Sequence, residues 1–214
     1  MRILASSPVI VAMDDHVALF VTMHPASMPK QATLLTNLRQ GARGYYRKLS
    51  SRCIAWSYLT PETSGSFGND GLIIAGLEIY TNKIALQEQL NDTTFFQPFE
   101  KLVVDEQLYA KEGTMVAWYL AAGFVTRSQE KTDGGGGVIV KVHKMTCSGS
   151  GEREAIVNGL GEFAGWSRGS DSGLLTFAVF TRKKSEREVL VYVRYRDKLA
   201  MRRIEERPEY QNIW

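Results

Sequence analysis

The sequence predicts an α+β fold in which two ferredoxin-like β-α-β-β-α-β units follow one another in tandem. The segment Tyr80–Leu86 recurs 115 residues later as Tyr195–Met201, and every position except the second is identical or chemically close. An apolar, strand-like run precedes each segment, and an aromatic–glutamine pair follows each, Phe96-Gln97 and Tyr210-Gln211. A period this long indicates two copies of one small domain rather than a solenoid of short repeats. We therefore expect any functional site to involve surfaces that the two copies form together.

The first copy, residues 14–132, has the hydrophobic periodicities of four strands with helices between them. His16–His24 alternates with period two and has one fully apolar face, which is typical of a strand packed against helices. Pro29–Lys48 has apolar residues at helical spacing, and Ser27 is placed to cap that helix. The other elements expected in this copy are a strand Cys53–Leu59, a strand ending at Tyr80, an Asn82-capped helix to about Leu90, a helix Phe95–Leu108 interrupted near Pro98, and a strand Met115–Val125.

The second copy, residues 137–214, follows a boundary formed by Asp133 and the glycines 134–137, which predicts a flexible linker. Its expected elements are a strand Val138–Met145, a helix with an apolar stripe from Ile156 to Ala164, strands Leu174–Thr181 and Val189–Tyr195, and an Asp197-capped helix to Trp214. No segment corresponds to the fourth strand of the first copy. Because an uncovered edge strand invites pairing, we expect either that Met1–Met13 folds back across the gap or that two chains form a homodimer, the favoured outcome.

The composition is that of a folded protein with a real core. Of its 214 residues, 44% are hydrophobic and 23% are charged. The net charge of +3 is spread over interspersed acidic and basic residues, which does not indicate a nucleic-acid-binding surface. Cys53 and Cys147 have neither disulfide-framework nor metal-ligand spacing and indicate free thiols in a reducing compartment. No run approaches the ~18 apolar residues of a membrane span. We expect a cytoplasmic protein without a nucleic-acid or membrane partner.

Short motifs after the third strand of each copy point to a known family. The first copy contains Glu78-Ile-Tyr80-Thr-Asn82, the helical segment Ala85–Leu90 and Phe96-Gln-x-x-Glu100; the second contains Tyr195-Arg-Asp197 and Arg207–Gln211. These motifs resemble those of the antibiotic biosynthesis monooxygenase-like family, twice over nearly the whole chain. The resemblance implies a dimeric α+β barrel, formed here as a pseudo-dimer within one chain.

The chain departs from that family in two places. The histidine often found in the helix after the third strand is Gln89 here, which disfavours the heme chemistry of some relatives. The family glutamate is kept as Glu78 but is Val193 in the second copy, so we expect one copy to carry the chemistry and the other to close the barrel. The sequence shows no Ser-His-Asp order, metal cluster or nucleotide fingerprint. We expect a colourless protein without metal, flavin or heme.

The alternation of each strand predicts which side chains face the barrel lumen. If Val17 and its apolar neighbours face the helices, then Phe20 and His24 face the lumen, and the same argument places Lys141 and His143 there. The candidate catalytic residues are His24 and His143 as bases near neutral pH and Tyr80 as a donor to a substrate phenol or ketone. These residues also have purely structural interpretations. The histidines and Lys141 are then solvated residues at a strand end or on an outward face, and Glu78 and Tyr80 form a structural pair. The candidate substrate-binding residues are Phe20, Trp56, Tyr58, Glu78, Trp118 and Lys141.

The resemblance implies an enzyme of specialised, aromatic polyketide-type metabolism. In the favoured hypothesis, a base removes a proton from a phenolic or anthrone-like substrate, and the resulting carbanion reacts with dioxygen in a dry aromatic cavity. The same base without oxygen would give a cyclase, dehydratase or isomerase. A non-catalytic small-molecule-binding barrel is the alternative from another class, and a lumen filled by Phe20, Trp56 and Trp118 would favour it.

Overall fold

A computed structural model describes residues 16–48, 50–61, 72–126 and 137–214. The first half contains β1 (Val17–Pro25), α1 (Met28–Gly41), the π-helical turn η1 (Ala42–Tyr46), β2 (Cys53–Leu59), β3 (Ile74–Tyr80), α2 (Lys83–Leu90), α3 (Phe96–Asp105) and β4 (Tyr109–Phe124). The second half contains β5 (Ile139–Thr146), α4 (Ser150–Ser170), β6 (Leu174–Arg182), β7 (Ser185–Tyr195), α5 (Lys198–Glu205) and α6 (Pro208–Gln211).

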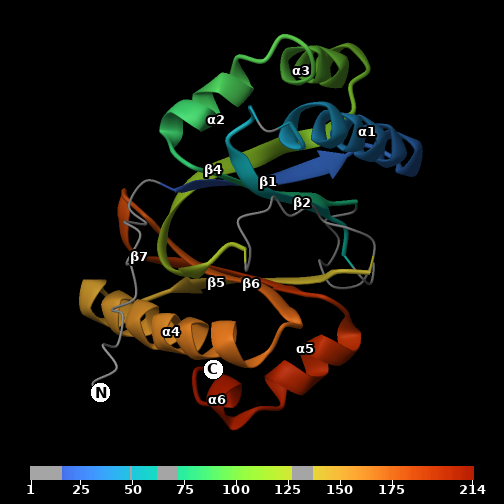
Figure 1. Cartoon of the computed structure of the whole chain (residues 1–214). Helices are drawn as coiled ribbons and strands as arrows, with labels where there is room; N and C mark the ends of the chain where they lie inside the picture. The colour runs from blue at the N-terminus through green and yellow to red at the C-terminus, as the bar shows by residue number, and fades with distance from the viewer. Residues whose placement is uncertain (1–15, 49, 62–71, 127–136) are drawn as a thin grey trace.

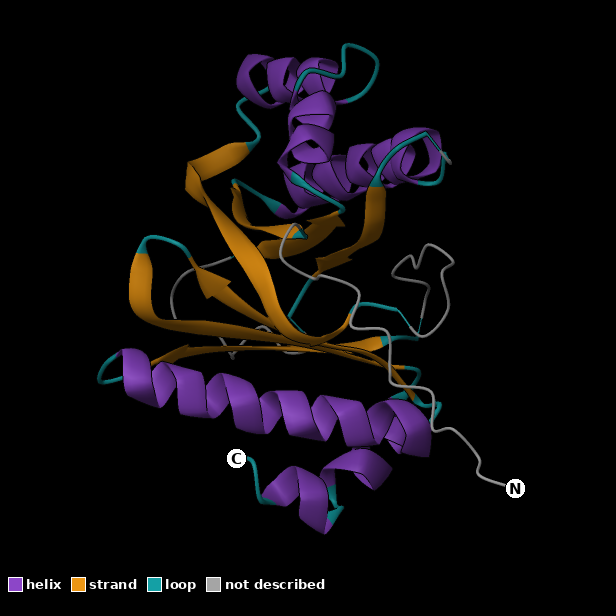
Figure 2. Cartoon of the chain, turned by 60° about the vertical axis from the view of Figure 1, so that its left-hand side comes forward, coloured by secondary structure: helices purple, strands orange, loops and turns teal. Residues whose placement is uncertain are grey.

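The described strands form one antiparallel sheet in the order β2-β3-β1-β4-β6-β7-β5. The order β2-β3-β1 in the first half is repeated as β6-β7-β5 in the second, so both halves have the ferredoxin-like arrangement. The sheet curls until its two halves face each other, with α1–α3 on the outer face of one and α4–α6 on the outer face of the other (Figures 1 and 2). The tandem α+β pseudo-dimer predicted from the repeat is confirmed.

Strand β4 joins the two half-sheets. Residues from Tyr109 to Tyr119 pair with β1, whereas Tyr119 to Phe124 pair with β6. The second half has no equivalent strand among the described residues, and there β5 pairs only with β7. The expected boundary between 14–132 and 137–214 stays a prediction, because the glycine linker up to residue 136 and Met1–Met13 lie outside the described residues.

Three hydrophobic clusters fill the spaces between these layers. Val17, Leu19, Val21 and Met23 pack with α1 on the helix side of β1, as their alternation predicted. The lumen cluster, between the half-sheets, contains Ala18 and Leu77 from one half and Phe180 and Tyr192 from the other. Phe20 and Trp118 also belong to the lumen cluster, whereas Trp56 packs on the helix side. The lumen therefore has a packed aromatic and aliphatic core.

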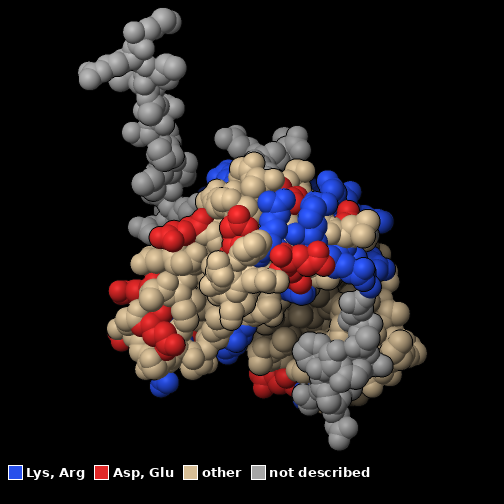
Figure 3. Space-filling model, turned by 90° about the horizontal axis from the view of Figure 1, so that it is seen from below, with Lys and Arg blue, Asp and Glu red and all other residues tan. Residues whose placement is uncertain are grey.

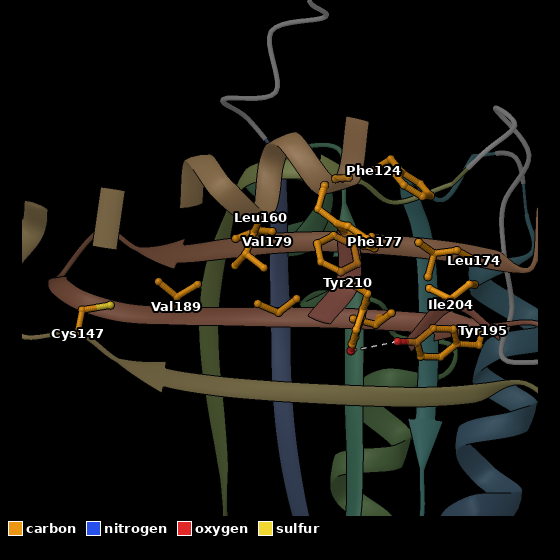
Figure 4. Packing of buried hydrophobic residues seen from close by; sticks show 14 residues of the cluster. Phe124, Cys147, Leu160, Leu174, Phe177, Val179, Val189, Tyr195, Ile204 and Tyr210 are labelled. Carbon is orange, nitrogen blue, oxygen red and sulfur yellow. Dashed lines mark hydrogen bonds between the residues drawn. The ribbon is translucent and has the colours of Figure 1, made fainter. Parts of the chain in front are cut away.

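The core of the second half lies between its sheet and α4–α6. Phe163, Phe177 and Tyr210 pack edge to face, with ring centroids 5.0 and 5.6 Å from that of Phe163. The Tyr195 hydroxyl lies 3.4 Å from the Tyr210 hydroxyl, the contact drawn as a dashed line in Figure 4. Side chains from β6, β7, α4 and α6 point toward one another in this view. This half therefore packs tightly beneath its helices.

Two helix boundaries differ from the sequence prediction, both at proline. Helix α3 is not interrupted near Pro98, because this proline lies in its first turn, where its missing N–H costs no intrahelical hydrogen bond. The predicted single helix from Asp197 to Trp214 is broken into α5 and α6. Arg207 has an extended ψ of 139°, the conformation imposed on a residue that precedes proline.

Charged side chains of both signs lie side by side on the face of α4–α6 (Figure 3). Asp171, at the end of α4, accepts hydrogen bonds from Nε and Nη2 of Arg203, each at 2.9 Å, and Arg207 lies 3.8 Å away.

No helix among the described residues is long and apolar enough to cross a membrane.

We expect Asp171→Asn to destabilise the fold by about 1–2 kcal/mol at neutral pH, because it leaves Arg203 and the Gly173 N–H without their charged acceptor. The hydrogen bonds from Arg203 lower the pKa of Asp171 below its usual value. A lowered folded pKa stabilises the protein above the unfolded pKa of about 3.9, and this contribution is lost as the pH falls through the folded pKa. Urea unfolding should show a wild-type-to-mutant difference that is constant from pH 7 to about pH 5 and shrinks below about pH 4.

Asp105→Asn is the matched control, because its partner Lys101 lies one turn earlier on α3 and both side chains are exposed. It should change the free energy of unfolding by less than about 0.5 kcal/mol at any pH. Equal effects of the two variants would contradict the structural role given to Asp171.

Candidate functional site

A cavity of about 410 Å³ lies between the first half-sheet and helix α3. Strands β1, β2, β3 and β4 supply one wall, and α3, with Leu38 of α1 and Gln89 and Leu90 of α2, supplies the other. The walls are mainly apolar, with aromatic rings from Tyr58, Phe96, Phe99 and Tyr109. A volume of this size and an apolar wall with few polar groups are typical of small-molecule sites. We call this space the first-half cavity.

The polar centre of the first-half cavity is the carboxylate of Glu78. Its side chain is only 4% exposed, and it accepts a hydrogen bond from the Tyr58 hydroxyl at 2.6 Å and another from the Tyr80 hydroxyl at 2.6 Å. Glu78 and Tyr80 lie two residues apart on β3 and share its helix-facing side. The Tyr46 hydroxyl, 3.1 Å from that of Tyr58, extends the chain of hydrogen bonds. A buried carboxylate is thus held in place by phenolic donors.

The tyrosines of this network keep their protons at neutral pH. Burial raises the pKa of Tyr58 well above its usual value, and the adjacent negative charge of Glu78 raises it further. The pKa of Tyr80 is raised well above its usual value by the same two causes in the same order. Both hydroxyls are therefore hydrogen-bond donors rather than phenolate bases. The group in this network that can accept a proton is the carboxylate of Glu78.

Gln89 contributes a second polar group to the cavity wall. It lies on α2, is 4% exposed, and its buried Oε1 has no hydrogen-bond partner among the described residues. An unpaired buried amide oxygen costs about 1–3 kcal/mol, so proteins retain such groups mainly where a ligand or water completes the hydrogen bond. Gln89 therefore provides a buried amide oxygen without a described partner in the wall of the cavity that Glu78 also lines.

The second half provides an internal comparison for both residues. With the offset of 115 residues that relates Tyr80 to Tyr195, Glu78 corresponds to Val193 and Gln89 to Ile204. Val193 is 0% and Ile204 is 1% exposed, and both belong to the hydrophobic core of the second half. The same fold is therefore built with apolar side chains at these positions. The polar pair of the first half is not required by the fold.

We expect Gln89→Ile, which introduces the residue of the second half, to stabilise the unliganded protein by about 1 kcal/mol. The substitution removes a buried amide without a partner and replaces it with an apolar side chain of similar volume. Urea unfolding gives the free energy, and Gln87→Leu, at an exposed position of the same helix, is the control. A loss of more than about 1 kcal/mol in Gln89→Ile would show that the amide is satisfied within the protein.

The predicted site residues lie in different layers of the fold. Tyr58 and Glu78 line the first-half cavity, and Tyr80 contacts it through Glu78. The residues in the lumen cluster are Phe20 and Trp118, and Trp56 packs against Tyr46 with ring centroids 5.3 Å apart. His24 lies near the end of β1 opposite Lys111, at an irregularity in the β1–β4 pairing, and is not among the residues that line the cavity.

The orientation predicted for Lys141 and His143 was wrong. Val140 and Val142 pack into the lumen cluster, so Lys141 and His143 face the helices of the second half. Lys141 forms an ion pair with Glu205 at 2.7 Å, and the His143 ring stacks on Trp214 with centroids 4.4 Å apart. Burial lowers the pKa of His143, and Lys141 lowers it further. The sequence correctly predicted which residues of β5 share a face. Because both faces of β5 are covered, alternation alone could not show which face points into the lumen.

The described residues contain no group of three or more His, Cys, Asp or Glu side chains that could hold a metal ion. The residues that sequence reasoning missed as site residues are Gln89, Glu100 and Glu112. Only the comparison of Gln89 with Ile204 in the repeat could have indicated the first of these.

Solved structures with the same fold are monooxygenase-like proteins. A proposed monooxygenase from Fusobacterium nucleatum is 9% identical, with a TM-score of 0.72, over 93% of this chain and 84% of that chain. Another from Lactobacillus acidophilus is 11% identical, with a TM-score of 0.70, over 94% and 86%. An anthrone oxidase-like protein is 12% identical, with a TM-score of 0.52, over 94% and 84%. No protein-family model and no curated protein matches the sequence. The tandem α+β fold implied by the sequence motifs is shared with these structures, and at this identity the likeness shows the fold alone.

Proposed function

We propose that this protein is a cofactor-independent enzyme that oxygenates a phenolic or anthrone-like substrate in the first-half cavity. The observation that carries the proposal is the Glu78 carboxylate, held by Tyr58 and Tyr80 at the wall of an apolar cavity. Its support from the comparisons is limited to the fold, which is shared with proteins described as monooxygenases. In this proposal Glu78 takes the role of base that the sequence suggested for His24 or His143.

The first step of the proposed reaction is a proton transfer. A methylene C–H bond that is conjugated with the carbonyl through the flanking aromatic rings, or a phenolic O–H bond, breaks, and its proton moves to a Glu78 oxygen. The electron pair stays on the substrate and is delocalised over its rings. Because the negative charge moves from Glu78 to the substrate, the charge of the cavity does not change. Tyr58, which also lines the cavity, then has a neutral acid beside it, which frees its hydroxyl to donate to the new anion, while Tyr80 holds Glu78 in place.

The second step consumes dioxygen. The substrate anion transfers one electron to dioxygen, and the two radicals combine to form a carbon–oxygen bond and a peroxide. The proton held on Glu78 returns to the outer peroxide oxygen. For an anthrone-like methylene, the remaining C–H bond and the O–O bond then break, giving a ketone and water. The balance is one methylene substrate and one dioxygen giving one ketone and one water. The apolar walls from Phe96, Phe99 and Tyr109 would keep water from the anion.

The test uses the purified chain with anthrone and isotopically labelled dioxygen. We expect anthraquinone to form faster than in buffer, with one labelled atom in the product and the other in water. An isomer of anthrone that forms in place of anthraquinone, and equally well under argon, would favour the isomerase alternative.

The non-catalytic alternative has one observation in its favour, the packed lumen with Phe20 and Trp118. It makes a separate prediction, namely that anthrone binds but turns over no faster than in buffer. Calorimetric binding and oxygen consumption on the same sample therefore distinguish an enzyme from a binding protein.

A further inference from the structure

The charge of the first-half cavity is unusual for this chain. The described residues that line it include Glu78, Glu100 and Glu112 but no Lys, Arg or His. The whole chain, in contrast, has a net charge of +3. A cavity with carboxylates of one sign and no counter-charge attracts cations and repels anions, and its apolar walls strengthen the effect.

Two of these carboxylates lie at the mouth of the cavity. Glu100 is on α3, Glu112 is on β4, and both are exposed and form no ion pair with another described residue. The cavity also has exposed apolar side chains, because Val104 and Met115 are 74% and 62% exposed and line it too. Large apolar side chains exposed beside unpaired carboxylates are suited to a ligand with an apolar body and a positive end.

Before any proton transfer, while Glu78 holds the tyrosine hydroxyls, the part of the cavity around Glu78 offers no free donor to an incoming anion. The Tyr58 and Tyr80 hydroxyls already donate to Glu78, and the unpaired atom of Gln89 is an acceptor. Assignment of amide oxygen and nitrogen follows the surrounding hydrogen bonds, and an amide turned the other way would still present no charge. A ligand carboxylate would therefore be desolvated next to Glu78 without a cationic partner.

We propose that the ligand of this cavity is an aromatic compound that carries a protonated amine and no carboxylate. Its rings lie among Tyr58, Phe96 and Phe99, its amine lies at the mouth between Glu100 and Glu112, and a hydroxyl or N–H at its inner end donates to Gln89. This inference rests on the proposed function in one respect: it names the class of substrate that the same cavity would bind. The positive amine would also stabilise the substrate anion of the first step.

The test compares the affinities of naphthalene probes that differ in charge: 1-naphthylmethylamine, 1-naphthylmethanol and 1-naphthoic acid. By isothermal calorimetry at low salt, we expect the amine to bind about 5- to 20-fold more tightly than the alcohol, and the acid to bind most weakly. Added salt should reduce the preference, because Glu100 and Glu112 are exposed. The double variant Glu100→Gln/Glu112→Gln should bind amine and alcohol almost equally.

The matched control is Glu154→Gln/Glu186→Gln, which removes the same charge at exposed positions of the second half. It should keep the full preference for the amine.

An acid that binds as tightly as the amine overturns the charge proposal and leaves the oxygenase proposal intact. Equal preference in both double variants overturns the placement of the amine at the mouth. Binding of none of the probes overturns the cavity as a ligand site, whereas amine preference without oxygen consumption overturns only the oxygenation.

Discussion

Replacing Glu78 with Gln is expected to lower the rate of oxygenation by about 100-fold or more, the usual loss when a positioned general base is removed. The amide cannot take up the substrate proton, although it keeps the size of the carboxylate and can still accept from a tyrosine. Substrate affinity should change much less than the rate, because the apolar walls are intact. Glu78→Asp keeps a carboxylate and should retain part of the rate. Single-turnover product formation and calorimetric binding measure the two effects separately.

A matched control is available in the second half, where Glu205 accepts a hydrogen bond from Tyr195 at 3.0 Å. Glu205→Gln removes a carboxylate paired with tyrosine on the same fold, but outside the first-half cavity. We expect it to leave the rate within about twofold of the wild type. A rate that survives Glu78→Gln in a folded protein would exclude Glu78 as the base.

Gly123→Ala is expected to destabilise the protein by about 2–5 kcal/mol, the largest effect on stability that we predict for a single methyl group. Gly123 lies in β4 where this strand pairs with β6, and its φ of 91° is strained for any L side chain. An added Cβ would also lie 2.0 Å from the carbonyl oxygen of Phe177 on β6. The pairing that joins the two halves would have to open locally.

The control for Gly123→Ala is Gly137→Ala, which separates the backbone strain of a positive φ from the steric clash of the added Cβ. Gly137 has nearly the same φ, 90°, but no atom of the described residues other than its chain neighbours lies within 4 Å of its added Cβ. This variant should cost only about 1–2 kcal/mol, the cost of the left-handed conformation alone. The free energies come from urea unfolding followed by circular dichroism. Equal losses in the two variants would mean that the β4–β6 contact at Gly123 relaxes without cost.

The repeat predicted the fold well because its motifs determine local geometry. Asn82 and Asp197 cap equivalent helices, accepting from Ala85 N at 2.9 Å and Ala200 N at 2.7 Å. These contacts are local in sequence, and therefore a sequence pattern reveals them. The length of β4 was underestimated, since it begins at Tyr109 rather than near Met115. Its first residues are mostly exposed and polar, so they have no apolar alternation to mark a strand.

The candidate site was only partly predictable. Glu78 and Tyr80 were identified because an acidic residue within an apolar strand stands out and the family motif contains both, and Tyr58 was identified as an aromatic residue at strand spacing. The direction of Lys141 and His143 could not be predicted, because apolar residues occupy both faces of β5. Glu112 gave no signal, since isolated surface glutamates are common, and Glu100 stood only in a family motif that gave it no role. Only the tertiary fold brings α3 and β4 to the same cavity, so the sequence could not place the two glutamates together.

The shared strand β4 also constrains the order in which the chain folds during synthesis. Residues up to Tyr119 can pair with β1 as soon as the first half has emerged, but Leu120–Phe124 must wait for β6, about 50 residues later. At ribosomal rates of about 5–20 residues per second, this apolar strand end is without its partner for roughly 3–10 s. An unpaired apolar strand end is prone to aggregation, and the second half removes that hazard by binding it. A chain terminated before β6 would still contain every residue that lines the first-half cavity, yet chaperones and proteases would govern its survival.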